Sequence, residues 1–184
     1  MVYPVVVYGD AVLRKRAESI PVGEDLAKLI ADMFETMYAA DGMGLAAPQI
    51  GKSIRLFVVD ATMVKDEPEL HDMKMVFVNP EIVGYEGAEW KVDEGCLSLP
   101  GLREDVLRPD RIRLKWYDEK WVAHEQEFSR WKARIIQHEY DHLEGKLFID
   151  YLSPLKRRLL KGKLNDISRG NVRADYRILA PMRK

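Results

Sequence analysis

The segment Trp131 to Glu144 constrains the fold of this chain more than any other, because it contains no glycine or proline. It carries His138, Glu139 and His142 at helical spacing, and it is followed by Gly145, a residue type that commonly ends helices. Residues four apart lie one above the other on the same face of a helix, so the two imidazoles project in one direction. We therefore expect a central helix that presents two potential metal ligands.

The residues from His138 to His142 match H-E-x-x-H, a pattern found in hydrolases that bind a divalent metal. Glu139 follows His138 by about 100° round the helix, which places its carboxylate beside a metal rather than on it. That position suits a general base that takes a proton from metal-bound water. The alternative is an ordinary solvated helix face, since so short a pattern also arises by chance.

The single cysteine, Cys96, is the candidate for the third ligand that two imidazoles need. Three ligands of the type Cys, His, His leave one tetrahedral position open, which is typical of a catalytic rather than a structural site. A lone cysteine is more often a small core residue, so this assignment competes with a purely structural one.

A glycine- and alanine-rich segment, GMGLAAPQ at 42–49, is the third unusual feature. Its small residues allow another backbone to approach closely, and the Gln49 amide could donate to a developing oxyanion. Taken alone, such a segment is usually a plain connector. It is not a phosphate loop, because the Gly-Lys-Ser/Thr ending is missing.

The remaining pattern predicts an α+β fold in which antiparallel β-sheets pack around the central helix. Apolar residues recur at spacings of three and four from Asp25 to Ala40, which predicts an N-terminal helix. Ser153 followed by Pro154 predicts the start of a C-terminal helix that runs to about Lys163.

Short segments rich in β-branched and aromatic residues, separated by turn residues, predict the strands. They are expected at 54–60, 75–78, 81–85, 88–92, 111–117 and 122–128. Residues 62–74 mix charge, proline and histidine without periodicity and are expected to form a solvated surface insertion. The tail, 165–184, is basic and poorly patterned.

The composition is that of a soluble globular protein with one domain, residues 1–184. Its 29 basic and 30 acidic residues give a formal charge of -1, so no overall field attracts nucleic acid or an anionic membrane. No stretch approaches the roughly 20 apolar residues of a membrane span, and the N-terminus lacks the order of a signal peptide. We therefore expect a cytoplasmic protein without a membrane partner or a sequence-specific nucleic-acid partner.

Three motifs in this order and at these separations closely resemble the signature of the peptide deformylase family: GMGLAAPQ from Gly42, EGCLS from Glu94 and HEYDH from His138. The similarity runs from about Val5 to Lys163, while 62–74 and the tail fall outside it. The resemblance implies a metal-dependent hydrolase that removes the formyl group from the N-terminal formylmethionine of nascent chains and releases formate.

The resemblance also assigns roles to residues of this chain. Cys96, His138 and His142 would hold one divalent ion, natively Fe2+, replaceable by Ni2+, Co2+ or, less actively, Zn2+. Glu139 would take the proton of the attacking water. The oxyanion would be stabilised by the metal, by Gln49 and by the Leu97 backbone N–H.

The family comparison further implies a peptide-binding cleft. The substrate would lie as an extra strand beside Gly44, with its methionine side chain in an apolar pocket. The pocket positions are Met43, Val92, Trp131, Arg134 and Ile135. Arg134 departs from the aliphatic residue of many members, so either its stem lines the wall with the charge outside or the pocket is more open.

Glu94 and Arg103 match a buried ion pair that supports the site in the family; an ordinary surface pair is the alternative. In related proteins the C-terminal helix can contact the ribosome near the peptide exit. A basic run here would suit that role, although such a run is usually a solvated helix face. The run consists of Lys156, Arg157, Arg158, Lys161 and Lys163.

Two rival functions use the same residues. A zinc endopeptidase also carries H-E-x-x-H, but its third ligand lies downstream of the helix, whereas Cys96 lies upstream. A non-catalytic protein with a structural metal would need a fourth protein ligand, for which Asp141 or Glu144 would have to serve.

Overall fold

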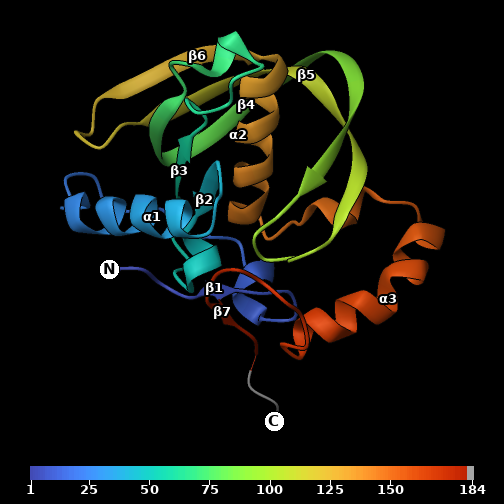
Figure 1. Ribbon diagram of the computed structural model, residues 1–184. Coiled ribbons are helices and arrows are strands. Elements are labelled where there is room, and N and C mark those ends of the chain that lie inside the picture. The colour runs from blue at the N-terminus through green and yellow to red at the C-terminus, as the bar shows by residue number, and fades with distance from the viewer. Residues whose placement is uncertain (182–184) are drawn as a thin grey trace.

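The helix expected at the centre of the molecule is α2, Arg130–Leu143, and it crosses the concave side of a curved sheet (Figure 1). The computed structural model describes residues 1–181. Gly145 follows α2 with a positive φ of 70°, and a β-carbon there would lie 2.6 Å from the Arg14 carbonyl oxygen. The glycine therefore ends the helix at a point where two backbones nearly touch.

The main sheet is antiparallel, with the strand order β2-β3-β4-β5-β6. Its strands are β2 (Gly44–Ala46), β3 (Leu56–Asp60), β4 (Lys74–Gly95), β5 (Arg103–Tyr117) and β6 (Ala123–Ser129). The buried face of this sheet and the apolar side of α2 form one core cluster, which includes Phe57, Phe77, Ile112 and Ile136. These observations confirm the predicted fold class.

The strand boundaries differ from the predicted ones in the long β4–β5 hairpin. The three segments expected at 75–78, 81–85 and 88–92 are one strand, β4, whose register shifts at three irregularities between Val78 and Glu89. β5 begins at Arg103 rather than at 111. Its first half is charged and contains Pro109, so it lacks the composition by which a strand is recognised.

The two flanking helices are α1 (Ala27–Ala39) and α3 (Pro154–Ser168). Both were expected, and α3 runs five residues beyond the predicted end. The Ser153 hydroxyl accepts a hydrogen bond from the Lys156 N–H at 3.2 Å, which confirms the predicted N-cap. Short 3-10 helices span Ala11–Arg14, Ala47–Ile50, Pro68–Leu70 and Phe148–Tyr151.

The expectation that 62–74 is simply solvated is wrong for two of its side chains. Leu70 and Met73 are 2% and 0% exposed and belong to the same core cluster as Phe77. A short segment with isolated apolar residues shows no periodicity, so its anchoring to the core could not be read from the pattern.

The described part of the tail, 165–181, is more regular than its composition suggested, and 182–184 lie outside the described residues. β7 (Ile178–Leu179) pairs in parallel with β1 (Val5–Val6), and the two strands lie together below the main sheet (Figure 1). Exposure alternates from 171 to 180, with Val172, Ala174 and Tyr176 on the less exposed side. This period of two is a strand pattern that the charged residues between them, Arg173 and Asp175, conceal. Among the described residues, no helix combines the length and apolarity that a membrane crossing requires.

Candidate metal centre

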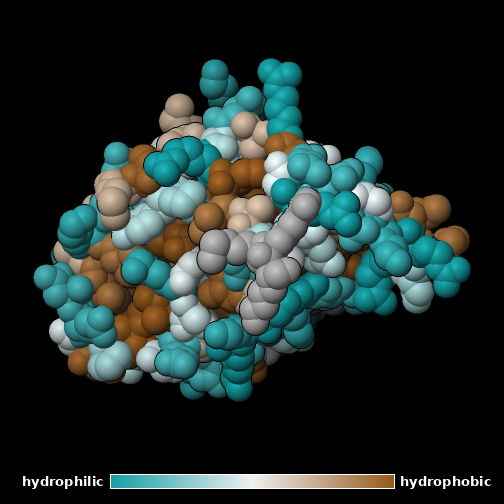
Figure 2. Space-filling model, turned by 90° about the horizontal axis from the view of Figure 1, so that it is seen from below, coloured by the Kyte–Doolittle hydropathy of each residue, from teal (hydrophilic) through white to brown (hydrophobic). Residues whose placement is uncertain are grey.

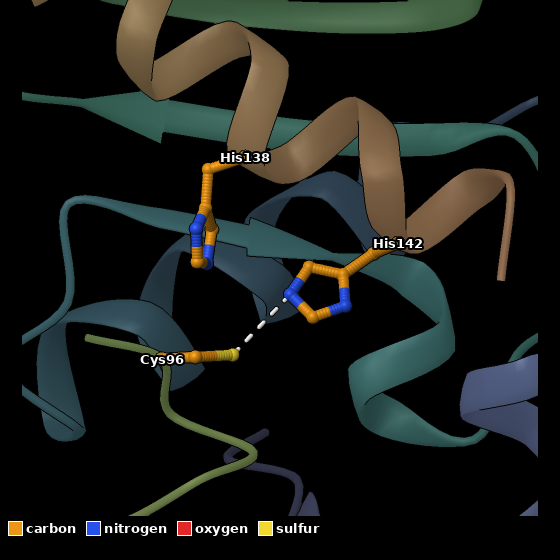
Figure 3. A group of neighbouring side chains, drawn as sticks. All are labelled: Cys96, His138 and His142. Atoms are coloured by element: carbon orange, nitrogen blue, oxygen red, sulfur yellow. Dashed lines mark hydrogen bonds between the residues drawn. The ribbon is translucent and has the colours of Figure 1, made fainter. Parts of the chain in front are cut away.

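The two histidines of α2 and the only cysteine meet at one point (Figure 3). His138 and His142 extend from successive turns of the helix toward Cys96, which directly follows β4. One nitrogen of each ring and the Cys96 sulfur all lie within 4.8 Å of one another, and Cys96 Sγ is 3.3 Å from His142 Nε2. The structure thus brings together the three residues that the sequence proposed as ligands.

The chemistry of these donors fits a divalent cation. His138 Nδ1 lies 3.1 Å from a Glu94 carboxylate oxygen, the outer contact that commonly orients a metal-binding imidazole and leaves its other nitrogen free. Burial lowers the pKa of His142 well below its usual value and so favours the neutral ring, which is the form that binds metal. A thiol and two imidazoles suit first-row transition metals, and three protein ligands leave a coordination position open.

Glu139 lies next to this centre without being part of it. The residue is 5% exposed, and its Oε2 atom has no hydrogen-bond partner among the described residues. Burial raises the pKa of Glu139 to about 7. A β-carbon at Gly44 would overlap the Glu139 side chain, so the glycine is needed for the carboxylate to pack against β2.

Gln49 reaches the centre from the 3-10 helix that follows β2. Its Oε1 atom accepts a hydrogen bond from the Ala46 N–H at 2.9 Å, which fixes the orientation of the amide. Its Nε2 atom donates to Ser98 Oγ at 3.2 Å and lies 3.6 Å from Cys96 Sγ. The amide donor is therefore held beside the proposed ligands, as is the backbone of Leu97, the residue after Cys96.

The expected ion pair between Glu94 and Arg103 is wrong. Arg103 is exposed and pairs with Asp93 at 2.6 Å, whereas Glu94 pairs with the buried Arg108 at 2.7 Å. The reason is the alternation of side chains along the β4–β5 hairpin, in which Glu94 lies opposite Glu104. Arg108 shares that face of the hairpin, while Arg103 points to the other. Arg108 was not predicted from the sequence, because its place on this face depends on the register of the hairpin.

Arg134 adopts neither of the two arrangements considered for it. It is 3% exposed, and its guanidinium is directed inward, with Nη1 2.9 Å from Glu94 Oε1 and Nη2 2.6 Å from the Trp90 carbonyl oxygen. The charge is therefore buried and paired. Arg108 bonds to both oxygens of Glu94, and Oε1 accepts the additional hydrogen bond from Arg134 because a carboxylate oxygen can accept more than one.

A cleft of about 370 Å³ opens onto the centre. It is lined by Gly44 and by all five predicted pocket residues: Met43, Val92, Trp131, Arg134 and Ile135. Met43 is half exposed at the rim. Tyr176, which sequence reasoning did not single out, also lines this cleft although it comes from the C-terminal segment.

Comparisons with known proteins agree with this site. The family described as polypeptide deformylase matches residues 2–158. The peptide deformylase of Cytophaga hutchinsonii is 51% identical over the whole of both chains, and that of Christiangramia forsetii is 45% identical over all of this chain and 98% of the relative.

Solved structures agree as well. A peptide deformylase from Legionella pneumophila has a TM-score of 0.81 and 42% identity, covering 94% of this chain and 99% of that one. A peptide deformylase from Ehrlichia chaffeensis in complex with actinonin has a TM-score of 0.82 and 34% identity, with the same coverage. With the motifs, the fold and the ligand geometry in agreement, the chain belongs to the peptide deformylase family, whose members use a divalent metal.

Proposed function

We propose that this chain hydrolyses the formyl group from the N-terminal formylmethionine of newly synthesised polypeptides and releases formate. One observation carries the proposal: Cys96, His138 and His142 offer ligand atoms within 4.8 Å of one another, beside the buried Glu139, in a member of this family. A metal-binding triad next to a buried carboxylate is an arrangement that supports metal-assisted hydrolysis of an amide.

Different residues of the chain carry out proton transfer and stabilise the oxyanion. A divalent cation, when bound, supplies Lewis acidity and lowers the pKa of water from 15.7 towards about 7. Glu139 accepts a proton from the attacking water and passes it to the departing amine, and its burial, which raises the pKa of Glu139, helps it to hold the proton between the two steps. The Gln49 amide and the Leu97 N–H donate to the oxyanion that develops on the formyl group.

We propose Fe2+ as the native ion, with Ni2+, Co2+ and Zn2+ able to replace it. The thiolate of Cys96 supports this assignment, because sulfur ligands favour such borderline and soft transition metals over Mg2+ or Ca2+.

The peptide binds along β2. This strand is at the edge of the main sheet, so the backbone groups on one of its sides are not used by a neighbouring strand. An extended substrate can pair with them, which is a common mode of peptide recognition. The first side chain then enters the cleft between Val92, Trp131 and Ile135, where an unbranched thioether such as methionine packs well.

The test is formate release from formyl-Met-Ala-Ser by protein purified and loaded with Fe2+ under anaerobic conditions. We expect formate and free Met-Ala-Ser in equal amounts, and no product from acetyl-Met-Ala-Ser. Absence of formate would defeat the proposal, and cleavage of a bond inside the peptide would favour an endopeptidase instead.

We propose further that the enzyme works in the cytoplasm and meets the ribosome through α3. The basic residues of this helix are all exposed, and its Leu155 and Leu159 are 66% and 75% exposed. Figure 2 shows hydrophobic atoms at the right-hand edge of the molecule, where α3 lies. A surface that is both basic and apolar suits a ribonucleoprotein partner.

Cosedimentation with ribosomes tests this contact. The double variant Arg157→Glu, Arg158→Glu should lose binding, whereas Lys65→Glu, Lys120→Glu, which makes the same charge change on other exposed residues, should retain it. Equal binding by the two double variants would contradict a role for α3.

A further inference from the structure

The residues that follow the proposed cysteine ligand form a tight turn. The Leu99 N–H donates to the Cys96 carbonyl oxygen at 2.9 Å, so Leu97 and Ser98 are the central residues of the turn. The common turn types differ in the orientation of the central peptide group, which here carries the Leu97 carbonyl. A contact to that carbonyl therefore selects one orientation of the turn.

Tyr176 makes this contact. Its hydroxyl donates to the Leu97 carbonyl oxygen at 2.8 Å. Burial raises the pKa of Tyr176 to about 12, so the hydroxyl is protonated and acts as a donor at neutral pH. The match to the family ends at residue 158, so Tyr176 belongs to a part of the chain that the family pattern does not describe.

The segment that carries Tyr176 is held in place by β1. The Val5 N–H donates to the Arg177 carbonyl at 2.8 Å, and the Val7 N–H donates to the Leu179 carbonyl at 3.1 Å. The Tyr8 N–H then donates to the Ser98 carbonyl at 2.9 Å. The start of the chain thus ties its C-terminal segment to the same turn.

The turn is connected in the other direction to Gln49. Ser98 is fully buried, and its hydroxyl accepts the Gln49 Nε2–H at 3.2 Å. Reorientation of the central peptide would move Ser98 and take this acceptor away from Gln49. The hydroxyl of Tyr176 is therefore linked through Leu97 and Ser98 to the amide that lies beside Cys96.

We propose that Tyr176 is a positioning residue: by holding the Leu97 carbonyl it fixes the Cys96–Leu99 turn, and so keeps the Leu97 N–H and the Gln49 amide directed at the formyl oxygen. This inference rests on the proposed function, because it assigns those two donors to the oxyanion. The simpler alternative is that the hydroxyl only satisfies a carbonyl and contributes to stability.

Tyr176→Phe removes the hydroxyl and leaves the ring, and Tyr8→Phe is the matched control. Tyr8 packs against the core cluster that contains Leu99 and Leu102, and no hydrogen bond of its hydroxyl occurs among the described residues. Loss of one hydrogen bond that acts in the transition state should lower kcat about threefold to tenfold with little change in KM. Tyr8→Phe should leave both constants unchanged.

Isotopic labelling of leucine carbonyl carbons and serine amide nitrogens gives a second readout, by NMR, that does not depend on turnover. The sequence contains two Leu-Ser pairs, Leu97–Ser98 and Leu152–Ser153, so the zinc-loaded protein should show two correlation signals. Tyr176→Phe should shift the signal of the first pair and leave that of the second in place. Tyr8→Phe should leave both.

The combined results decide the proposal. A shifted Leu97–Ser98 signal together with a lower kcat supports it. A shifted signal with wild-type kcat shows that the contact is only structural, and an unmoved signal shows that the hydroxyl does not fix the turn; either result overturns it. If the wild-type chain releases no formate, the proposed function fails by itself, and with it the oxyanion role of Tyr176, while the signals still report whether Tyr176 holds the turn.

Discussion

Two glutamates that are almost equally buried lie near His138 and differ in their surroundings. Glu94 is 6% exposed and contacts Arg108, Arg134 and His138. Glu139 is 5% exposed, and one of its oxygens has no partner among the described residues. Burial alone therefore does not distinguish them; their partners do.

These surroundings suit Glu94 to orienting a ligand and Glu139 to transferring a proton. Burial disfavours the charged form of Glu94, but its contacts with His138 and Arg108 outweigh burial and lower its pKa. For Glu139 burial dominates and raises the pKa to about 7. A carboxylate that is permanently charged and paired can orient a ligand, whereas one that changes its protonation state near neutrality can transfer a proton.

The largest expected effect comes from removing the unpaired carboxylate. Glu139→Gln keeps the size of the side chain but removes the base, so kcat for formyl-Met-Ala-Ser should fall by about 10²–10⁴-fold. The exposed Glu127→Gln serves as the control and should keep wild-type kcat. Turnover by Glu139→Gln within tenfold of wild type would remove the distinction between the two glutamates.

The next effect is on the stability of the paired carboxylate. Glu94→Gln leaves Arg134 buried with a neutral partner and Arg108 with Asp141 as its remaining carboxylate, which should cost about 3–5 kcal/mol of the free energy of unfolding. Urea denaturation of zinc-loaded protein measures the loss. A cost below about 1 kcal/mol would mean that the buried cations find other partners.

The third prediction concerns pH in metal-free protein. The pKa of Glu139 rises from 4.5 in the unfolded chain to about 7 in the folded one, so folding favours the protonated form and stability falls as pH rises through this range. Glu139→Gln should therefore unfold like wild type near pH 4.5 and be more stable by about 3 kcal/mol near pH 8. Glu94, whose pKa is lowered, contributes in the opposite sense: its stabilisation is present above pH 4.5 and is lost as pH falls. If the free energies of unfolding of wild type and Glu139→Gln differed by the same amount from pH 4.5 to pH 8, this account would be contradicted.

The smallest effect is expected at Arg103, which the family resemblance paired with Glu94 and which pairs with the exposed Asp93 instead. Arg103 and Asp93 have side chains that are 62% and 55% exposed, so Arg103→Gln should change the free energy of unfolding by less than about 1 kcal/mol. Arg108→Met in the same hairpin should cost several times more, since it leaves Glu94 and Asp141 buried without it. Similar losses in the two variants, measured by urea denaturation, would contradict the assignment.

The sequence predicted the proposed ligands because the geometry of the two histidines is local. Helical periodicity alone places His138 and His142 on one face, and Cys96 had no competitor of its type. The partner of Glu94 could not be predicted in this way, because the choice between Arg103 and Arg108 depends on which face of a hairpin each occupies. That face depends on a register that the charged first half of β5 did not reveal.

The C-terminal segment shows a second limit of prediction from the sequence. The inward positions Val172, Ala174 and Tyr176 alternate with Arg173 and Asp175, so a period of two was present but diluted by charge. Only the pairing of β7 with β1 shows that the two ends of the chain meet, and only the position of Tyr176 shows that they meet at the cleft. Contacts between distant segments leave little trace in local composition.

The most direct test of the division between ligands and base is the metal content of three proteins purified and loaded under the same anaerobic conditions. Wild type and Glu139→Gln should each retain about one divalent ion per chain after exhaustive dialysis, whereas Cys96→Ser should retain much less. Loss of the ion from Glu139→Gln, or full retention by Cys96→Ser, would contradict the account.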